Sequence, residues 1–68
     1  MEIFRERLKN ERKTAGYTQA DMAEKLGIKQ PSYIRYENGS SEPSLETLCL
    51  IADIFDVTVD YLLGRAEF

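Results

Sequence analysis

Three polar side chains within twenty residues have the chemistry needed to read a DNA duplex. They lie in residues 19–38, QADMAEKLGIKQPSYIRYEN. The carboxamide of Gln30 can bond N6 and N7 of adenine together, and the guanidinium of Arg35 can bond O6 and N7 of guanine, or a phosphate. Gln19 falls at a helix N-terminus, where side chain and backbone amides favour an anion such as a phosphate. Packing requires none of the three, so they are our candidate DNA contacts.

Three neighbouring side chains extend this candidate surface. Ile34 lies on the exposed flank of the helix that carries Gln30 and Arg35, and it can contact a thymine methyl group. Packing against the following loop is an equal alternative. Ser32 and Lys29 can donate hydrogen bonds to phosphates. Gln19 and Gln30 can alternatively be ordinary solvated side chains, and Arg35 can alternatively form a surface ion pair.

Two short helices joined by a tight turn would position these side chains. The first spans residues 19–26, with Thr18 as its N-cap and Asp21 as the acid of a capping box. The second spans residues 30–37. Gly27 supplies the positive φ that the turn needs, and the small Ala23 permits a close helix crossing. Apolar residues flank the crossing: Met22, Leu26, Ile28, Tyr33 and Tyr36.

Three further helices are expected, over residues 3–15, 45–55 and 59–63. Gly16 and Gly64 stop the first and the last, while Ser44 and Thr58 cap the starts of the second and third. Periodicity assigns the buried faces to Phe4, Leu8 and Ala15 in the first and to Leu45, Leu48, Cys49, Ala52 and Phe55 in the second. No stretch alternates with period two. We therefore predict an all-α, five-helix fold forming one domain over residues 1–68.

Composition favours a small intracellular binding domain over an enzyme. No apolar run approaches the roughly 18 residues of a membrane span, and the amino-terminal residues lack the apolar stretch of a signal peptide. We therefore expect a cytoplasmic protein without a membrane partner. The chain has no histidine and one cysteine, Cys49, which we place on a buried face as an inert thiol. Without a metal-ligand cluster or a glycine-rich phosphate loop, we expect no catalysis, metal or cofactor.

The order of these residues resembles the lambda-repressor-like, Cro-type (XRE-like) helix-turn-helix family. The matching segments cover nearly the whole chain: residues 7–9 (RLK), Gly16, residues 18–19 (TQ), residues 22–28 (MAEKLGI), Gln30, residues 35–39 (RYENG), residues 42–48 (EPSLETL), residues 52–53 (AD) and residues 60–64 (DYLLG). The resemblance implies a DNA-binding domain whose second motif helix enters the major groove.

The resemblance also implies roles for particular residues. Gln19 would bond a phosphate and brace the base-reading glutamine, Gln30. Asn38 would bond a phosphate, although a plain helix stop is an alternative interpretation. Arg12 and Glu37 both point inward by periodicity. They would form a partly buried ion pair between the helix over residues 3–15 and the recognition helix over residues 30–37, and this pair would position the recognition helix.

Two features depart from the family pattern. The loop after Asn38 usually carries Lys or Arg, but here it reads Ser40-Ser41-Glu42, and the chain has a net charge of −3. Arg5, Lys9 and Lys13 form a basic stripe that can contact phosphates or simply be solvated. We therefore expect weak DNA binding by a monomer and reliance on a homodimer.

An apolar patch is the expected dimer contact. It comprises Leu50, Ile54, Leu63 and Phe68, and the alternative is that Phe68 folds back over it. The leading interpretation is a sequence-specific regulator of transcription, with a repressor favoured, that binds an inverted repeat in double-stranded DNA. The alternative is an antitoxin-like or protein-interaction module on the same fold.

Overall fold

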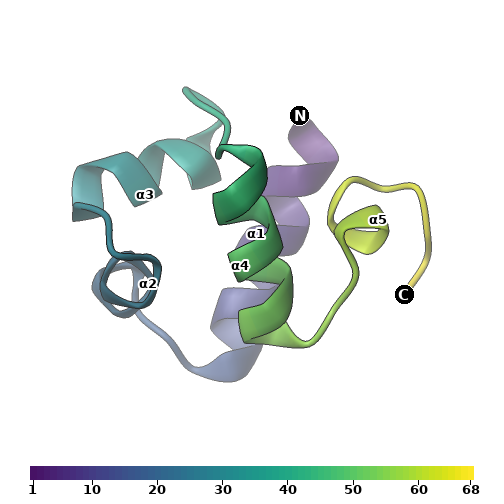
Figure 1. Cartoon of the computed structure of the whole chain (residues 1–68), viewed down its shortest axis with the longest axis horizontal. Coiled ribbons are helices and arrows are strands. Elements are labelled where there is room, and N and C mark those ends of the chain that lie inside the picture. Colours follow the sequence, from purple (N-terminus) through teal and green to yellow (C-terminus); the bar gives the residue numbers. More distant parts are fainter.

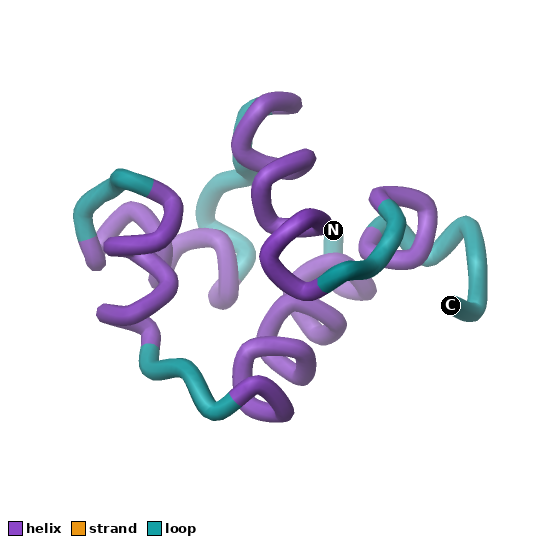
Figure 2. The backbone as a smooth tube through the Cα atoms, turned by 60° about the horizontal axis from the view of Figure 1, so that its bottom comes forward, coloured by secondary structure: helices purple, strands orange, loops and turns teal.

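Five helices and no strand make up the computed structural model, which describes residues 1–68. The helices are α1 (Glu2–Ala15), α2 (Gln19–Leu26), α3 (Gln30–Asn38), α4 (Leu45–Phe55) and α5 (Val59–Leu62). Figure 1 shows α1 behind α4 at the centre, with α2 and α3 on one side and α5 on the other. The tube in Figure 2 shows the same order, with short loops between all helices. The all-α, five-helix prediction is confirmed. No helix has the length and apolar character needed to cross a bilayer.

Local signals set the ends of the motif helices. The Thr18 hydroxyl accepts from the Asp21 amide at 3.0 Å, and the Thr18 amide donates to the Asp21 carboxylate at 2.8 Å. The hydrogen bond from the Thr18 backbone lowers the pKa of Asp21 below its usual value. Gly27 ends α2 in the left-handed region, with φ of 68°. The capping box and the glycine stop occur as the sequence predicts.

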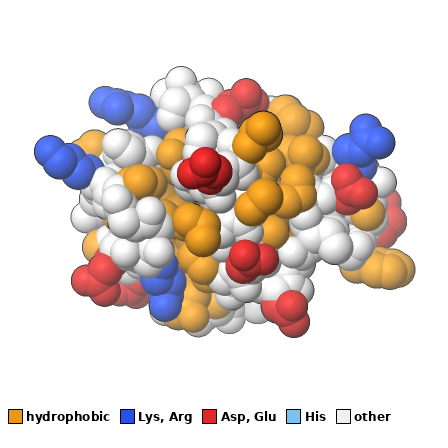
Figure 3. Space-filling model, in the orientation of Figure 1, with side chains coloured by type: hydrophobic (Ala, Val, Ile, Leu, Met, Phe, Trp, Pro, Cys, Tyr) orange, Lys and Arg blue, Asp and Glu red, His pale blue; other side chains and the backbone are white.

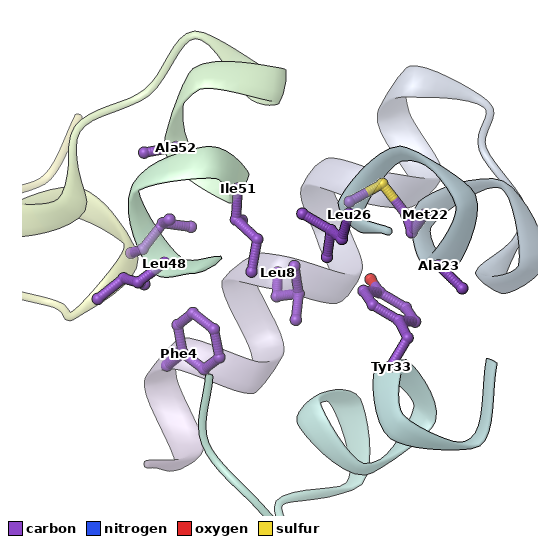
Figure 4. Close-up of a cluster of buried hydrophobic side chains, with 10 residues drawn as sticks. Phe4, Leu8, Met22, Ala23, Leu26, Tyr33, Leu48, Ile51 and Ala52 are labelled. Atoms are coloured by element: carbon purple, nitrogen blue, oxygen red, sulfur yellow. The ribbon is translucent and has the colours of Figure 1, made fainter. Parts of the chain in front are cut away.

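One fully buried side chain from each helix forms the centre of the core. These side chains are Leu8, Met22, Tyr33, Ile51 and Leu62. Figure 4 shows four of them converging with Phe4, Ala23, Leu26, Leu48 and Ala52 between the helices. Burial of one such aliphatic side chain contributes about 1.5–3 kcal/mol. Because every helix contributes to one core, the orientation of α3 depends on all the others.

The buried face of α4 differs from the prediction. Ile51 is fully buried, whereas Leu45 is 81% exposed and Cys49 is also exposed. The inward stripe is Leu48, Ile51, Ala52 and Phe55, rotated from the expected one. Apolar residues occur nearly all round this helix, so periodicity alone fits two stripes equally well. The expectation that Cys49 is a buried thiol is therefore wrong.

The predicted burial of Ala15 is also wrong. This residue was expected on the buried face of the first helix, but it is exposed. Gly16 follows it with φ of 79° and ends the helix. The last turn of α1 still contacts α3, but through Arg12, whose guanidinium pairs with Glu37.

Half-buried Arg7 docks the short α5 against α1. Its guanidinium donates to the backbone carbonyls of Tyr61 and Ala66 and lies 4.3 Å from the centre of the Tyr61 ring. A four-residue helix has too few internal hydrogen bonds to be stable alone. The arginine therefore anchors this end of the chain to the scaffold that carries α3.

Candidate nucleic-acid interface

The α2–turn–α3 unit has the steep crossing of a helix-turn-helix motif. Figure 1 views α2 nearly along its axis, whereas α3 lies across the view. Ala23 is buried at the crossing, and Tyr33 packs against the core from α3. Lys29 precedes α3 and provides no side-chain cap, and Pro31 occupies the first turn, where an amide has no intrahelical partner.

The outward face of α3 presents the predicted base-reading side chains. Gln30 and Arg35 are exposed, and neither makes a side-chain hydrogen bond or an ion pair within the chain. Arg35 therefore does not form the surface ion pair that was its alternative interpretation. Ile34 and Ser32 are half-buried, while Lys29 is exposed beside Gln30. The structure thus leaves two unpaired hydrogen-bonding side chains on one helix surface.

A buried carboxylate fixes the inward face of the same helix. The Glu37 side chain is 4% exposed, and the Arg12 guanidinium donates to it twice, from Nε at 2.6 Å and from Nη2 at 3.1 Å. The Tyr33 hydroxyl donates to Glu37 at 2.5 Å, and Arg12 Nη1 also donates to the Tyr17 carbonyl at 2.9 Å. This ion pair joins α1, the α1–α2 turn and α3.

The pKa values of the cluster follow from these contacts. Burial alone would raise the pKa of Glu37, but hydrogen bonds from Arg12, Tyr33 and Gln19 outweigh it and hold the pKa below its usual value. Burial, and then the bond to Glu37, raise the pKa of Tyr33. The hydrogen bond to Glu37 raises the pKa of Arg12. At neutral pH the pair is therefore ionised and the phenol is protonated.

Gln19 lies in the cluster rather than against Gln30. Its Nε2 donates to Glu37 Oε1 at 3.2 Å, and no hydrogen bond joins it to Gln30. The resemblance implied that Gln19 braces Gln30, but in the structure Gln19 bonds the Glu37 carboxylate instead. A carboxamide nitrogen carries two hydrogens, so Gln19 retains one for an outside acceptor. The position of Gln19 is thus fixed from inside the protein.

Charge is segregated along the chain, which the sequence analysis missed. Eight of the nine Lys and Arg residues lie within residues 1–35, whereas residues 36–64 contain six acids and no Lys or Arg. Figure 3 shows blue side chains at the end where α3 lies and red ones over the region of α4, with a further blue side chain at the opposite end and red ones at the lower left. The signal was present in residue order, but the net charge averages it away. The candidate interface belongs to the positive part of the chain.

The expected dimer residues do not share one environment. Leu50 is 47% exposed and Phe68 is 94% exposed, whereas Ile54 and Leu63 pack partly against the core. Phe68 therefore does not fold back over the patch. Leu50 instead shares a shallow apolar depression with Leu45 and Cys49 on the outer side of α4. The exposed apolar surface is centred on α4 more than on α5.

The geometry defines a helix-turn-helix domain, and comparison with known proteins places it in a family. Residues 8–62 match the model of a family described as "Helix-turn-helix" (HTH_3). The chain belongs to this helix-turn-helix family, of the Cro-type (XRE-like) group that the sequence resembles.

Its relatives include bacterial and phage regulators. The chain is 52% identical over 61 residues to the uncharacterized HTH-type transcriptional regulator YqaE of Bacillus subtilis, covering 90% of this chain and 53% of that protein. It is 46% identical over 62 residues to the cryptic phage CTXphi transcriptional repressor RstR of Vibrio cholerae, covering 91% and 55%. A more distant relative is the antitoxin PezA of Streptococcus pneumoniae, 38% identical over 58 residues, covering 85% and 37%. The chain spans about half the length of YqaE and RstR.

Proposed function

We propose that residues 1–68 form the DNA-binding domain of a sequence-specific regulator that represses transcription by occupying a promoter. The observation that carries the proposal is the two-sided construction of α3. Its inner side is fixed by a buried, ionised carboxylate, and its outer side presents Gln30 and Arg35 without intramolecular partners. A rigid helix with free hydrogen-bonding groups is what major-groove reading requires.

Contacts along α3 are proposed in two groups. Gln30 reads adenine, Arg35 reads guanine, and Ile34 contacts a thymine methyl group. Lys29 and Ser32 at the start of the helix donate to phosphates, together with the outward hydrogen of Gln19. Asn38 donates to a phosphate at the other end. The phosphate contacts set the register in which the base contacts are made.

The proposed active species is a homodimer bound to an inverted repeat. Two recognition helices would enter successive major grooves about 34 Å apart, one helical turn of DNA. The outer face of α4 supports this proposal, because Leu50 and its neighbour Leu45 are exposed apolar side chains with no partner in the monomer. The proposed contact extends over Ile54 and Leu63 to Phe68 on the α5 side.

Sedimentation of the Leu50→Glu variant tests the dimer. The parent should sediment as a dimer at high concentration and the variant as a monomer, because the substitution places a charge in the apolar contact. A parent that remains monomeric at every concentration would refute the dimer.

Selection of bound duplexes from a random pool tests the base contacts. The parent should enrich one inverted repeat. Gln30→Ala should relax the preference at one position of each half-site, and Arg35→Ala at another, each by about 1–3 kcal/mol of discrimination. Lys25→Ala is a matched control, because Lys25 is exposed on α2 and lies over the Tyr17 ring instead of on the outer face of α3. If both α3 variants select the parent sequence, the assignment of base reading is wrong.

An antitoxin-like role is the second candidate. It is favoured by the similarity to the antitoxin PezA and by the exposed apolar face of α4, which a protein partner could cover. It is compatible with DNA binding, since the two surfaces lie on different helices. A protein that selects no duplex at all would favour an interaction module instead of a regulator.

A further inference from the structure

The C-terminal end of α3 is held by an arginine from the start of α1. Arg5 Nη1 donates to the backbone carbonyl of Asn38 at 2.9 Å. The two residues are 33 positions apart in sequence, so the contact is a product of the fold. Gly39 follows with φ of 85°, and a Cβ built on it would lie 2.7 Å from Arg5 Nη1. The backbone at this corner therefore lies close against the guanidinium.

The side chain of Asn38 is fixed at the same corner. Its Oδ1 accepts from the Ser40 amide at 2.9 Å and from the Ser40 hydroxyl at 2.5 Å. With its oxygen engaged, the carboxamide has only its amino group left to offer, and that group is a donor with two hydrogens. Asn38 is exposed, so the donor is available to an outside acceptor.

A helix C-terminus is by itself a poor place for a phosphate. Its unsatisfied carbonyls carry the equivalent of about half a negative charge. The loop that follows adds no cation, because it reads Ser40-Ser41-Glu42. Arg5 changes this environment, since its guanidinium covers the last carbonyl of α3 and brings a full positive charge. It has five N–H groups, and the structure engages one of them.

We propose that Arg5 and Asn38 together form a binding site for a DNA-backbone phosphate at the C-terminal corner of α3. Arg5 supplies the charge that the loop lacks, and Asn38 supplies a neutral donor with a fixed orientation. The guanidinium is already ordered by Asn38, so little conformational entropy is lost when the phosphate binds. The site rests on the proposed DNA-binding function, and it adds a charged donor from α1 to the phosphate contact proposed for Asn38.

The test is the salt dependence of binding to the selected duplex, measured by fluorescence anisotropy. Arg5→Gln keeps a donor for the Asn38 carbonyl and removes the charge. Loss of one phosphate contact should lower the slope of log K against log salt by about 0.9, and weaken binding about eightfold at 0.1 M salt. Arg65→Gln removes the same charge from the opposite side, where Arg65 is 74% exposed beside Asp60, and should leave the slope unchanged.

A second variant keeps the test decisive if Arg5→Gln is unstable. Arg5→Lys retains the charge, so its slope should match the parent even if its affinity is lower. The proposal is overturned if Arg5→Gln, shown by thermal melting to be folded, has the parent slope, or if Arg5→Lys loses the slope as Gln does. In either case DNA binding by the parent would stand. If the parent selects no duplex, the DNA-binding function fails and the phosphate site fails with it.

Discussion

Arg12→Ala should strongly destabilise the scaffold of α3. It removes the only cation beside the Glu37 carboxylate, whose side chain is 4% exposed. Tyr33 and Gln19 would remain as neutral donors. Breaking a buried pair by removing one partner costs about 3–5 kcal/mol, because the other charge stays buried. A domain of 68 residues has a free energy of unfolding of only about 3–10 kcal/mol. The change should therefore remove a large part of the stability of the domain.

The pH dependence separates this mechanism from a loss of packing. In the parent, the pKa of Glu37 lies below its ordinary value of 4.5. The group therefore stabilises the fold above pH 4.5 and loses that contribution as the pH falls through the lowered pKa. In Arg12→Ala, desolvation would raise the pKa of Glu37, so the carboxyl group takes up a proton more easily when folded. The difference in stability should then be largest at neutral pH and shrink toward pH 4.

Urea unfolding of both proteins between pH 4 and pH 7 measures this difference. All other carboxylates are common to the two proteins, so most of their contribution cancels. Arg65→Ala is the control, because the Arg65–Asp60 pair is exposed on both sides, with a distance of 3.5 Å, and should contribute about 0–1 kcal/mol. A loss below 1 kcal/mol for Arg12→Ala, or a loss that does not vary with pH, would refute the argument.

Four further changes test the local structure by the same urea assay. Thr18→Ala should cost about 1 kcal/mol, because the first turn of α2 loses its cap, and an unchanged midpoint would contradict the capping box. Tyr33→Phe should cost about 1.5–3 kcal/mol, since its hydroxyl donates to a buried charge, and a loss under 0.5 kcal/mol would contradict that bond. Gly27→Ala should cost about 1–2 kcal/mol for the left-handed backbone alone. Gly39→Ala should cost more, because its methyl group also displaces Arg5, and equal losses at the two glycines would show that the guanidinium yields freely.

The helix boundaries were predictable because their signals are local. Thr18, Ser44 and Thr58 each cap the helix that follows, and Gly16 and Gly27 take positive φ where the sequence predicted stops. A cap or a glycine stop acts through hydrogen bonds within four or five residues. Such signals can be read from a single sequence without knowledge of the fold.

The orientation of α4 was not predictable from the same kind of signal. Its residues are apolar on several sides, so the stripe containing Leu45 and Cys49 and the stripe containing Ile51 fit the helical period equally well. The choice depends on which stripe the other helices can cover. Contacts with Leu8 and Leu62 in one core decide it, and these are tertiary. The sequence offered phosphate contact as one alternative for Arg5, but its hydrogen bond to Asn38 was missed for the same reason, because this partner lies 33 residues away.

The acidic net charge is compatible with phosphate binding once its location is considered. Asp56 lies between α4 and α5 and Asp60 lies on α5, which Figure 1 shows on the other side of the central α1 and α4 from α3. The molecule extends 29 × 23 × 19 Å, whereas the Debye length at physiological salt is about 8 Å. These acids are therefore largely screened from a duplex bound at α3. The phosphates respond mainly to the nearer charges, and among those Lys29, Arg35 and Arg5 surround the recognition helix.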